Sequence, residues 1–491
     1  MTQDIDWSAI APPLVLAVAA VVVLLVDAFA GPPRSRQAAL VPATLTVLAV
    51  VAAAVPTLRL VGDPRQTFCV ERRLDGPVRC SFQVDGFTLV LWAVVLFGTA
   101  VVALVGTVAV ADGRTPMGEW SFLLLSSATG ALTIAAARDL VTLVVALEVV
   151  SLPAFAMVGL RRDDARAAEA SVKFFLVSVI STALTLLGVS LLYGATGSVF
   201  LTDLDAGLPL DGAIGRVAVT GGLLTVVGLA FKVAAVPFHM WVPDTYVGAP
   251  VAVAAYLSVV SKAAGFAGLI LVLEVGLAGL RDTWSPVLAV MAALTMTVGN
   301  VLAVRQRHAI RLLAWSSVAQ AGYVLVPLGT GVAGGEAVGS SLAYLAVYAF
   351  VNLSAFAVAA VVGTRYPAQR LSDYRGLVRD EPGAGWPLAF ALVALAGLPP
   401  GIVGLLAKVV VLDAAAGPVT WLAVVMAANV AIGLVYYLRW LVELFRPAGE
   451  DASRYDVPNG VAAAIGMTCA AGVLFSVVPG WLFDPVLAVL G

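Results

Sequence analysis

Charged side chains are scarce in this chain of 491 residues, which is 61% hydrophobic and only 12% charged. A soluble domain of ordinary composition carries about a quarter charged residues, so this composition excludes a soluble globular protein. The net charge of −2 provides no basic surface for a nucleic acid, and we expect no such partner. We therefore expect most of the chain to lie in a lipid bilayer.

Histidine and cysteine are also scarce, with two and three residues. These numbers are too small to supply the ligands of a haem, an iron–sulfur cluster or a zinc site, so we expect no cofactor in this chain. Cys69 and Cys80 lie on one long loop, residues 61–85. We predict that they form a disulfide that closes a short hairpin on an oxidising side of the membrane, the alternative being two free thiols.

Long apolar runs, separated by charges and by Gly and Pro clusters, predict an all-α polytopic membrane protein, because about 20 apolar residues suffice for a helix to cross a bilayer. The runs give fourteen transmembrane helices, at residues 10–30, 38–60, 86–110, 120–137, 140–160, 170–193, 217–240, 250–277, 285–304, 311–329, 339–363, 387–413, 420–444 and 459–480.

Prolines interrupt two of these helices in mid-span. Pro237 interrupts the seventh, and Pro399 with Pro400 interrupts the twelfth. Broken helices at matching positions in two halves of a membrane protein indicate an ion site. Because the two are an odd number of helices apart, they imply an inverted repeat. The alternative is that these prolines are ordinary kinks.

Arginines predict how the chain is oriented. Fifteen of the 24 lie in the odd-numbered loops and eight in the even-numbered loops. The positive-inside rule places the odd-numbered loops in the cytoplasm. Both termini are then expected on the outer face of a bacterial inner membrane.

Only four lysines occur, Lys173, Lys232, Lys262 and Lys408, and all lie within predicted spans, whereas 23 of the 24 arginines lie in loops. Arginine stays charged, whereas a desolvated lysine can release a proton. An ionisable residue inside the membrane indicates function. We therefore predict that the lysines form a proton pathway. The alternative is structural lysines, most plainly for Lys173, since Glu169 lies four residues before it in the order that favours an ion pair.

Other polar residues extend this pathway. Glu148 is the one carboxylate deep in a predicted span, and we expect a lysine on a neighbouring helix as its partner. His239, near Asp244 at the inner end of the seventh span, belongs to the residue type that titrates near neutral pH, so it is either a proton relay or a hydrogen-bonded interfacial histidine. We also expect Arg439 and Glu443, four residues apart, to pair with each other.

Several motifs resemble the antiporter-like subunits of respiratory complex I over residues 120–445, and subunit N in particular. The matching segments are F-K-V-A-A-V-P-F-H-M-W-V-P-D-T-Y-V-G-A-P at 231–250, S-V-V-S-K-A-A-G-F at 258–266, R-L-L-A-W-S-S-V-A-Q-A-G-Y at 311–323, D-Y-R-G-L at 373–377 and A-G-L-P-P at 396–400.

The resemblance implies a fold of fourteen helices with two inverted five-helix repeats and broken helices seven and twelve. Its parts would be an N-terminal unit at 1–119, repeats at 120–277 and 285–445, and a last helix with its tail at 446–491. Glu148 matches the family's fifth-helix glutamate, Lys232 and Lys262 match its central lysines, and Lys408 matches its twelfth-helix residue. Gln320 stands where family members often have histidine, and glutamine cannot carry a proton charge. Whether a proton relay passes through that position is therefore an open question.

The resemblance implies a proton-translocating subunit of NADH-quinone oxidoreductase. The flavin and iron–sulfur clusters would belong to other subunits, and the partners would be membrane lipid and the K-type and M-type subunits. Two alternatives are a subunit of a multisubunit Na⁺/H⁺ antiporter and a scaffold subunit with an idle channel. The lysines argue against the scaffold, and the segments at 261–266 and 373–377 argue against the antiporter.

Overall fold

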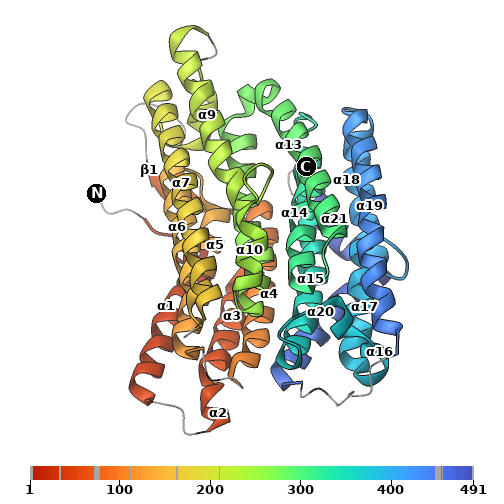
Figure 1. The fold of residues 1–491 in the computed structure, drawn as a ribbon. Helices are drawn as coiled ribbons and strands as arrows, with labels where there is room; N and C mark the ends of the chain where they lie inside the picture. Colours follow the sequence, from red (N-terminus) through yellow and green to blue (C-terminus); the bar gives the residue numbers. More distant parts are fainter. Residues whose placement is uncertain are drawn as a thin grey trace.

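The computed structural model describes residues 4–31, 35–70, 78–110, 113, 115–161, 164–209, 211–447, 455 and 457–488, which form a bundle of long helices (Figure 1). In these ranges, twelve helices are long and apolar enough to cross a membrane. The predicted all-α polytopic fold is confirmed.

The helices follow one another along the whole chain. The first half contains α1 (Trp7–Ala30), α2 (Arg36–Ala39), α3 (Val41–Arg59), α4 (Gly86–Gly106), α5 (Met117–Ala136), α6 (Leu140–Gly159), α7 (Ala165–Thr196), α8 (Leu201–Gly207), α9 (Gly212–Lys232), α10 (Trp241–Gly248), α11 (Val251–Tyr256) and α12 (Lys262–Leu271). The second half contains α13 (Arg281–Val304), α14 (Ala309–Leu328), α15 (Gly335–Arg365), α16 (Leu377–Asp380), α17 (Pro382–Ala396), α18 (Ile402–Ala416), α19 (Thr420–Phe445), α20 (Asn459–Val477) and α21 (Gly480–Leu487).

Short segments of other geometry join these helices. They are the 3₁₀-helices η1 (Thr107–Val110), η4 (Ala278–Leu280) and η5 (Leu371–Tyr374), the π-helices η2 (Leu257–Ser261) and η3 (Val272–Gly276), and the strands β1 (Arg65–Val70) and β2 (Arg79–Val84). The two π-helices flank α12, so Lys262 begins an α-helix directly after a stretch of wider winding.

Two of the fourteen predicted spans are absent from the twelve long apolar helices. The span predicted at 120–137 corresponds to α5, and the one at 387–413 is divided between α17 and α18. The total of fourteen, the inverted repeats and the four-part division of the chain stay predictions.

Helix α15 occupies the centre of the second half of the bundle. It packs against α4, α14, α17, α18, α20 and α21, and its most apolar 18-residue stretch is entirely buried. A helix that is apolar and covered on all sides is a core element. Helices α1, α3 and α7, by contrast, have only a third of the equivalent stretch buried, so they present apolar side chains outward.

The first predicted break lies between α9 and α10. Pro237 has no N–H to donate, and Ala234 adopts a positive φ of 63°, which a helix does not allow. The groups released from helical bonding find partners on other elements: the N–H of Val236 donates to Thr295 Oγ1 at 2.9 Å, and Trp241 Nε1 donates to the carbonyl oxygen of Phe231 at 3.3 Å. Other parts of the protein thus supply partners for these groups, as a break at membrane depth requires.

The second predicted break separates α17 from α18. Gly397 ends α17 with a φ of 83°, in the left-handed region that glycine adopts without strain. Pro399 and Pro400 follow, and the chain resumes as a helix at Ile402. Lys408 lies in the second turn after the break, so both interrupted helices carry a lysine near the interruption.

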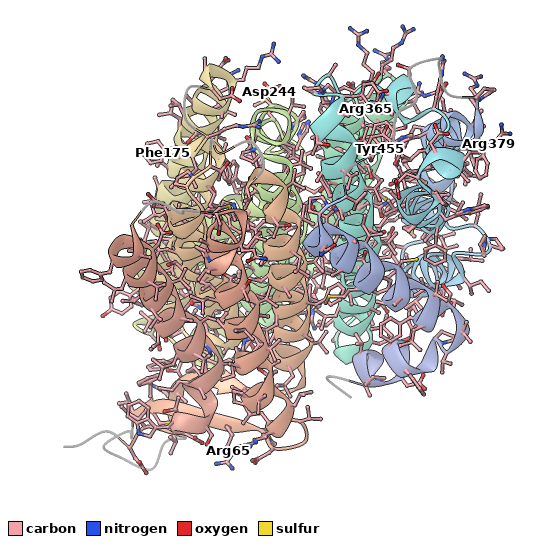
Figure 2. All side chains as sticks on the ribbon, turned by 90° about the horizontal axis from the view of Figure 1, so that it is seen from below. Arg65, Phe175, Asp244, Arg365, Arg379 and Tyr455 are labelled. Carbon is pink, nitrogen blue, oxygen red and sulfur yellow. A yellow bond between two sulfur atoms is a disulfide. The ribbon has the colours of Figure 1, made fainter. Side chains whose placement is uncertain are left out.

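A β-hairpin is the main departure from the helical architecture. Strands β1 and β2 pair in an antiparallel register that places Cys69 opposite Cys80, and a disulfide joins the two residues. Arg65 at the start of β1 lies at the opposite end of the molecule from Asp244, Arg365 and Arg379 (Figure 2). We call the end that carries the hairpin the hairpin face.

The hairpin is anchored to several distant segments. Arg65 pairs with Asp6 at the N-terminus, at 3.3 Å, and Arg79 pairs with Asp203 of α8 at 2.7 Å. Arg138, which is only 9% exposed, pairs with Asp85 at 2.7 Å. Its backbone N–H donates to the carbonyl oxygen of Ser81 at 2.9 Å. The hairpin thus holds the ends of α1, α4, α5 and α6 at the hairpin face together.

Six of the arginines used to predict the orientation lie outside the described residues: Arg34, Arg72, Arg73, Arg114, Arg162 and Arg454. The first and the last described residues of the chain nevertheless both lie at the hairpin face. Asp6 contacts the hairpin, and α21 packs against the start of α15, where Gly339 approaches Leu487.

The disulfide allows a simple count of thiols. Of the three cysteines, only Cys469 is free, so protein purified without reductant and then denatured should react with one equivalent of an alkylating reagent, and with three after reduction. Mass spectrometry of the alkylated chain measures this count. Three alkylated cysteines without reductant would contradict the disulfide.

Candidate functional site

Lys232 is the last residue of α9, and its side chain is buried between α6 and α7. Its Nζ donates to Ser151 Oγ at 2.7 Å and to Ser178 Oγ at 2.8 Å. Gly265 of α12 packs against the backbone of Lys232, because a Cβ there would lie 3.0 Å from the Cβ of Lys232. The amine is therefore enclosed and held by hydroxyl groups alone.

Glu148 does not pair directly with a lysine, contrary to the expectation from the sequence. Its Oε1 accepts a hydrogen bond from Thr182 Oγ1 at 2.7 Å, and within the described chain no lysine nitrogen lies within 4.0 Å of it. Thr182 lies one turn from Ser178 on α7, and Ser151 lies one turn from Glu148 on α6. Hydroxyl groups thus stand between the carboxylate and Lys232.

Lys262 is held by a single residue of α14. Its Nζ donates to the backbone oxygen of Ser317 at 2.5 Å and to Ser317 Oγ at 2.6 Å. The same Oγ accepts from the hydroxyl of Tyr348 on α15 at 2.9 Å, and the Tyr348 ring lies 5.8 Å from the Lys262 nitrogen. All three side chains are buried.

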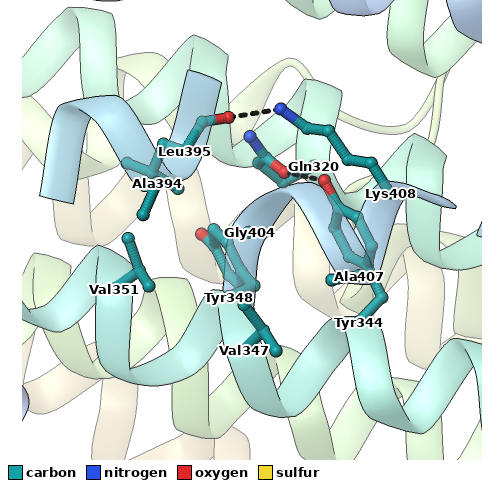
Figure 3. Close-up of a pocket in the computed structure, with 10 residues that line it drawn as sticks. All are labelled: Gln320, Tyr344, Val347, Tyr348, Val351, Ala394, Leu395, Gly404, Ala407 and Lys408. Carbon is teal, nitrogen blue, oxygen red and sulfur yellow. Dashed lines mark hydrogen bonds between the residues drawn. The ribbon is translucent and has the colours of Figure 1, made fainter. Parts of the chain in front are cut away.

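Lys408 reaches back across the second break. Its Nζ donates to the carbonyl oxygen of Leu395 at 2.5 Å (Figure 3). This oxygen belongs to the last turn of α17, where helix carbonyls lack intrahelical partners and carry partial negative charge, so it is a favourable place for an ammonium. Gly397 makes the approach possible, since a Cβ there would meet the Lys408 nitrogen at 3.1 Å.

A small cavity of about 10 Å³ lies beside Lys408 (Figure 3). Its polar lining groups come from Lys408, Gln320 of α14, and Tyr344 and Tyr348 of α15. The Tyr344 hydroxyl donates to Gln320 Oε1 at 2.5 Å, and Gln320 Nε2 donates to the hydroxyl of Tyr437 at 3.0 Å. Helices α14 and α15 therefore contribute polar side chains to the surroundings of both Lys262 and Lys408.

Lys232, Lys262 and Lys408 are buried and Glu148 is half-buried beside Thr182, whereas the other two predicted residues lie apart from them. Lys173 is half-exposed and pairs with Glu169 at 2.7 Å and with Asp244 at 3.8 Å. His239 lies in the first break with its ring 5.5 Å from that of Trp315, and its Nδ1 is buried without a hydrogen-bond partner in the described chain.

The predicted pair of Arg439 and Glu443 is wrong. Arg439 donates to the backbone carbonyls of Val304, at 2.8 Å, and Gln306, which end α13. Glu443 instead accepts from Arg375 and Arg446, both at 2.7 Å. Unfilled carbonyls at a helix end attract cations, and they outcompete a carboxylate one turn away.

Sequence reasoning missed the hydroxyl and amide groups that surround the lysines. The clearest signal was on α15, where Tyr344, Tyr348 and Asn352 recur every fourth residue and so share one face of an apolar helix. Asn352 Nδ2 donates to Ser258 Oγ in η2, at 2.8 Å. A polar stripe on a wholly buried helix can only face other parts of the protein, here η2 and α14.

Known proteins resemble this chain along almost its whole length. Residues 137–434 match the family described as NADH:quinone oxidoreductase/Mrp antiporter, TM. Proteins named NADH-quinone oxidoreductase subunit N 2 from Streptomyces griseus and NADH-quinone oxidoreductase subunit N from Salinispora tropica are 51% and 46% identical. These alignments cover 98% and 91% of this chain and 93% and 87% of the relatives.

Solved structures agree with these matches. A chain of respiratory complex I from Thermus thermophilus with bound aureothin superposes with a TM-score of 0.75 at 30% identity, covering 98% of this chain and all of its own length. A chain of the Mrp complex from a Dietzia species has a TM-score of 0.83 at 21% identity, covering 98% of this chain and 96% of its own, which shows a common fold alone.

His308, which the sequence did not single out, caps the helix that carries Ser317 and Gln320. Its Nδ1 accepts a hydrogen bond from the N–H of Arg311 at 3.4 Å, which requires an unprotonated nitrogen. Burial lowers the pKa of His308, the nearby charge of Arg311 lowers it further, and Asp373 partly offsets both. The folded chain thus binds a proton here less readily than the unfolded chain does.

This cap predicts a dependence of stability on pH. Because unfolding takes up a proton at His308, stability should fall as the pH falls through the ordinary histidine pKa of about 6.5. Asparagine also caps helices but does not titrate, so His308→Asn should reduce this loss. Thermal unfolding of both proteins in detergent, between about pH 7.5 and 5.5, measures it. Equal pH dependence of the two midpoints would exclude His308 as the cause.

Proposed function

Because this chain belongs to the subunit N family of NADH-quinone oxidoreductase, we propose that its buried lysines relay the protons that the enzyme moves across the membrane. The chain is a transmembrane, antiporter-like subunit of that proton-translocating complex. Its part in the enzyme is the passage of protons, and oxidation of NADH is assigned to other subunits. We assign the relay to Glu148, Lys232, Lys262 and Lys408.

The observation that carries this assignment is the kind of partner that each lysine has. Lys232, Lys262 and Lys408 are between 2% and 9% exposed, and within the described chain none has a carboxylate within 4.0 Å. Neutral hydroxyl and carbonyl oxygens hold all three. An amine in such a setting keeps hydrogen bonds in either protonation state, because the neutral amine still has two N–H groups to donate to a hydroxyl or carbonyl oxygen.

Glu148 completes the relay near Lys232. The Thr182 and Ser178 hydroxyls on α7 and the Ser151 hydroxyl on α6 separate the carboxylate from the amine, and movement of these side chains would close or open the pair. Closing the pair favours the charged amine, and opening it favours the neutral one. Movement of α7 against α6, driven by quinone reduction elsewhere in the enzyme, would then load and release a proton.

The remaining predicted residues lie near the end of the molecule opposite the hairpin face. We propose His239, in the break that follows Lys232, as the point where protons enter from the cytoplasm. Lys173 supports this end through its ion pairs with Glu169 and Asp244. The arginine distribution supports the further proposal that the hairpin face and both termini lie outside, in a bacterial inner membrane.

The surroundings of the chain follow from its apolar outer surface. Helices α1, α3 and α7 expose large apolar side chains, among them Val18, Leu48 and Ile180. We propose that lipid and the neighbouring K-type and M-type subunits cover these helices. No cofactor is assigned to this chain, and the flavin and iron–sulfur clusters are assigned to partner subunits. The subunit N names of the relatives favour this role over that of an antiporter subunit.

Substitution of Lys408 tests the relay in the assembled enzyme. Lys408→Ala should slow proton transfer through this chain by about 100-fold or more, the effect of losing a proton-transfer group. Lys408→Arg keeps a positive charge but cannot release a proton, so it should fail equally. Proton uptake by membrane vesicles, divided by NADH oxidised, measures transfer.

The control is assembly of the enzyme. NADH oxidation with an artificial electron acceptor and the amount of this chain in the complex should both stay unchanged. Lys232→Ala and Lys232→Arg form a second pair with the same expected result. Normal pumping by the alanine variants in a fully assembled enzyme would exclude the relay. Normal pumping by the arginine variants alone would show that the lysines act as fixed positive charges and not as proton carriers.

A further inference from the structure

Tyr348 stands between the surroundings of Lys262 and those of Lys408. Its hydroxyl is within hydrogen-bonding distance of Ser317 Oγ, 2.9 Å away, and that same oxygen lies 2.6 Å from the Lys262 nitrogen. Its side chain also lines the cavity beside Lys408 (Figure 3). Tyr348 and Ser317 are at most 3% exposed, so bulk water does not reach this contact.

The cavity next to Lys408 matches one water molecule. Its volume of about 10 Å³ is at the lower limit for a single water, and a buried water needs two to four polar partners. Lys408, Tyr344, Tyr348 and Gln320 supply polar groups at its wall. A water here can join the Tyr348 hydroxyl to the Lys408 amine.

Gln320 lines the same cavity but is unsuited to carry a proton. Its amide oxygen already accepts from Tyr344 and its amide nitrogen already donates to Tyr437. An amide has no protonation change at physiological pH, so it fixes the direction of these hydrogen bonds and does not pass a proton along them. The route between the two lysines therefore avoids residue 320.

We propose that Tyr348 carries the proton between Lys262 and Lys408, through Ser317 on one side and one water in the cavity on the other. This inference rests on the relay proposed above and names the group that joins two of its members. Tyr348 is identified by its two contacts, one on each side.

The transfer balances without any change of oxidation state. The Tyr348 O–H, which donates to Ser317 Oγ in the structure, first turns toward the water. The Lys262 ammonium then gives one proton to Ser317 Oγ, which passes its own proton to the Tyr348 oxygen. Tyr348 passes its own proton to the water, and the water gives one to the neutral amine of Lys408. Each hydroxyl accepts one proton and releases another, and the O–H groups must turn back before the next transfer. The same steps run in reverse.

Tyr348→Phe tests this role in the complete enzyme, because it removes only the hydroxyl and keeps the ring beside Lys262. Protons pumped per NADH should fall to the level of Lys408→Ala, with NADH oxidation by an artificial acceptor and the amount of assembled enzyme unchanged. Tyr256→Phe is the matched control. It also removes a buried hydroxyl, one that donates to Ser127 at 2.7 Å and has no lysine among its hydrogen-bond partners in the described chain, and it should pump like the wild type.

A second substitution separates a proton carrier from a packing residue. Gln320→His in the Tyr348→Phe background places an imidazole at the wall of the same cavity. It should restore pumping and add a pH dependence near neutrality, where imidazole titrates. A residue that served only in packing would not be replaced by an imidazole on another helix.

The outcomes distinguish this inference from the relay itself. Normal pumping by Tyr348→Phe, with pumping lost in Lys408→Ala, overturns the role of Tyr348 and leaves the relay standing. If Tyr348→Phe loses pumping and Gln320→His does not restore it, the role of Tyr348 as a proton carrier is also overturned. Normal pumping by Lys408→Ala removes the relay and this inference together.

Discussion

Burial of a charged amine governs the architecture of this chain, since an ammonium without hydrogen-bond acceptors is far more costly in a protein interior than in water. Lys232, Lys262 and Lys408 meet this requirement with serine hydroxyls and backbone carbonyls. Each of these three arrangements requires an interruption of regular helix near the lysine. α9 stops at Lys232, α12 begins at Lys262 after a π-helix, and α17 ends so that its last turn can receive Lys408.

Irregular backbone of this kind must be held firmly, and the rest of the fold provides the support. Thr295 and Trp241 satisfy the groups released at the first break. Helix α15 fills the centre of the second half and carries the tyrosines that face the lysines. The disulfide-closed hairpin joins helix ends at the hairpin face through ion pairs of Arg79 and Arg138.

Much of this arrangement could be predicted from the sequence, because its signals are strong. Lysines confined to apolar runs, prolines in mid-span and a carboxylate deep in a helix are rare enough in membrane segments to be informative by position alone. The partners of these residues could not be predicted. A serine or threonine in an apolar helix bonds its own backbone as readily as a neighbour's amine, so Ser151, Ser178 and Ser317 carried no distinguishing mark. Arg439 illustrates the same limit, since vacant carbonyls at a helix end are invisible in a sequence.

The shortness of α18 has a consequence for how the protein is made. Its 15 residues extend about 22 Å, less than the roughly 30 Å hydrocarbon core of a bilayer, and α17 is equally short. Neither α17 nor α18 is long enough to cross a membrane alone. The two helices must therefore enter the membrane together and dock against a helix that is already in place. Helix α15 is that helix, since it contacts both and is synthesised before them. The surroundings of Lys408 are complete only when both α17 and α18 are in place, because its amine bonds a carbonyl of α17.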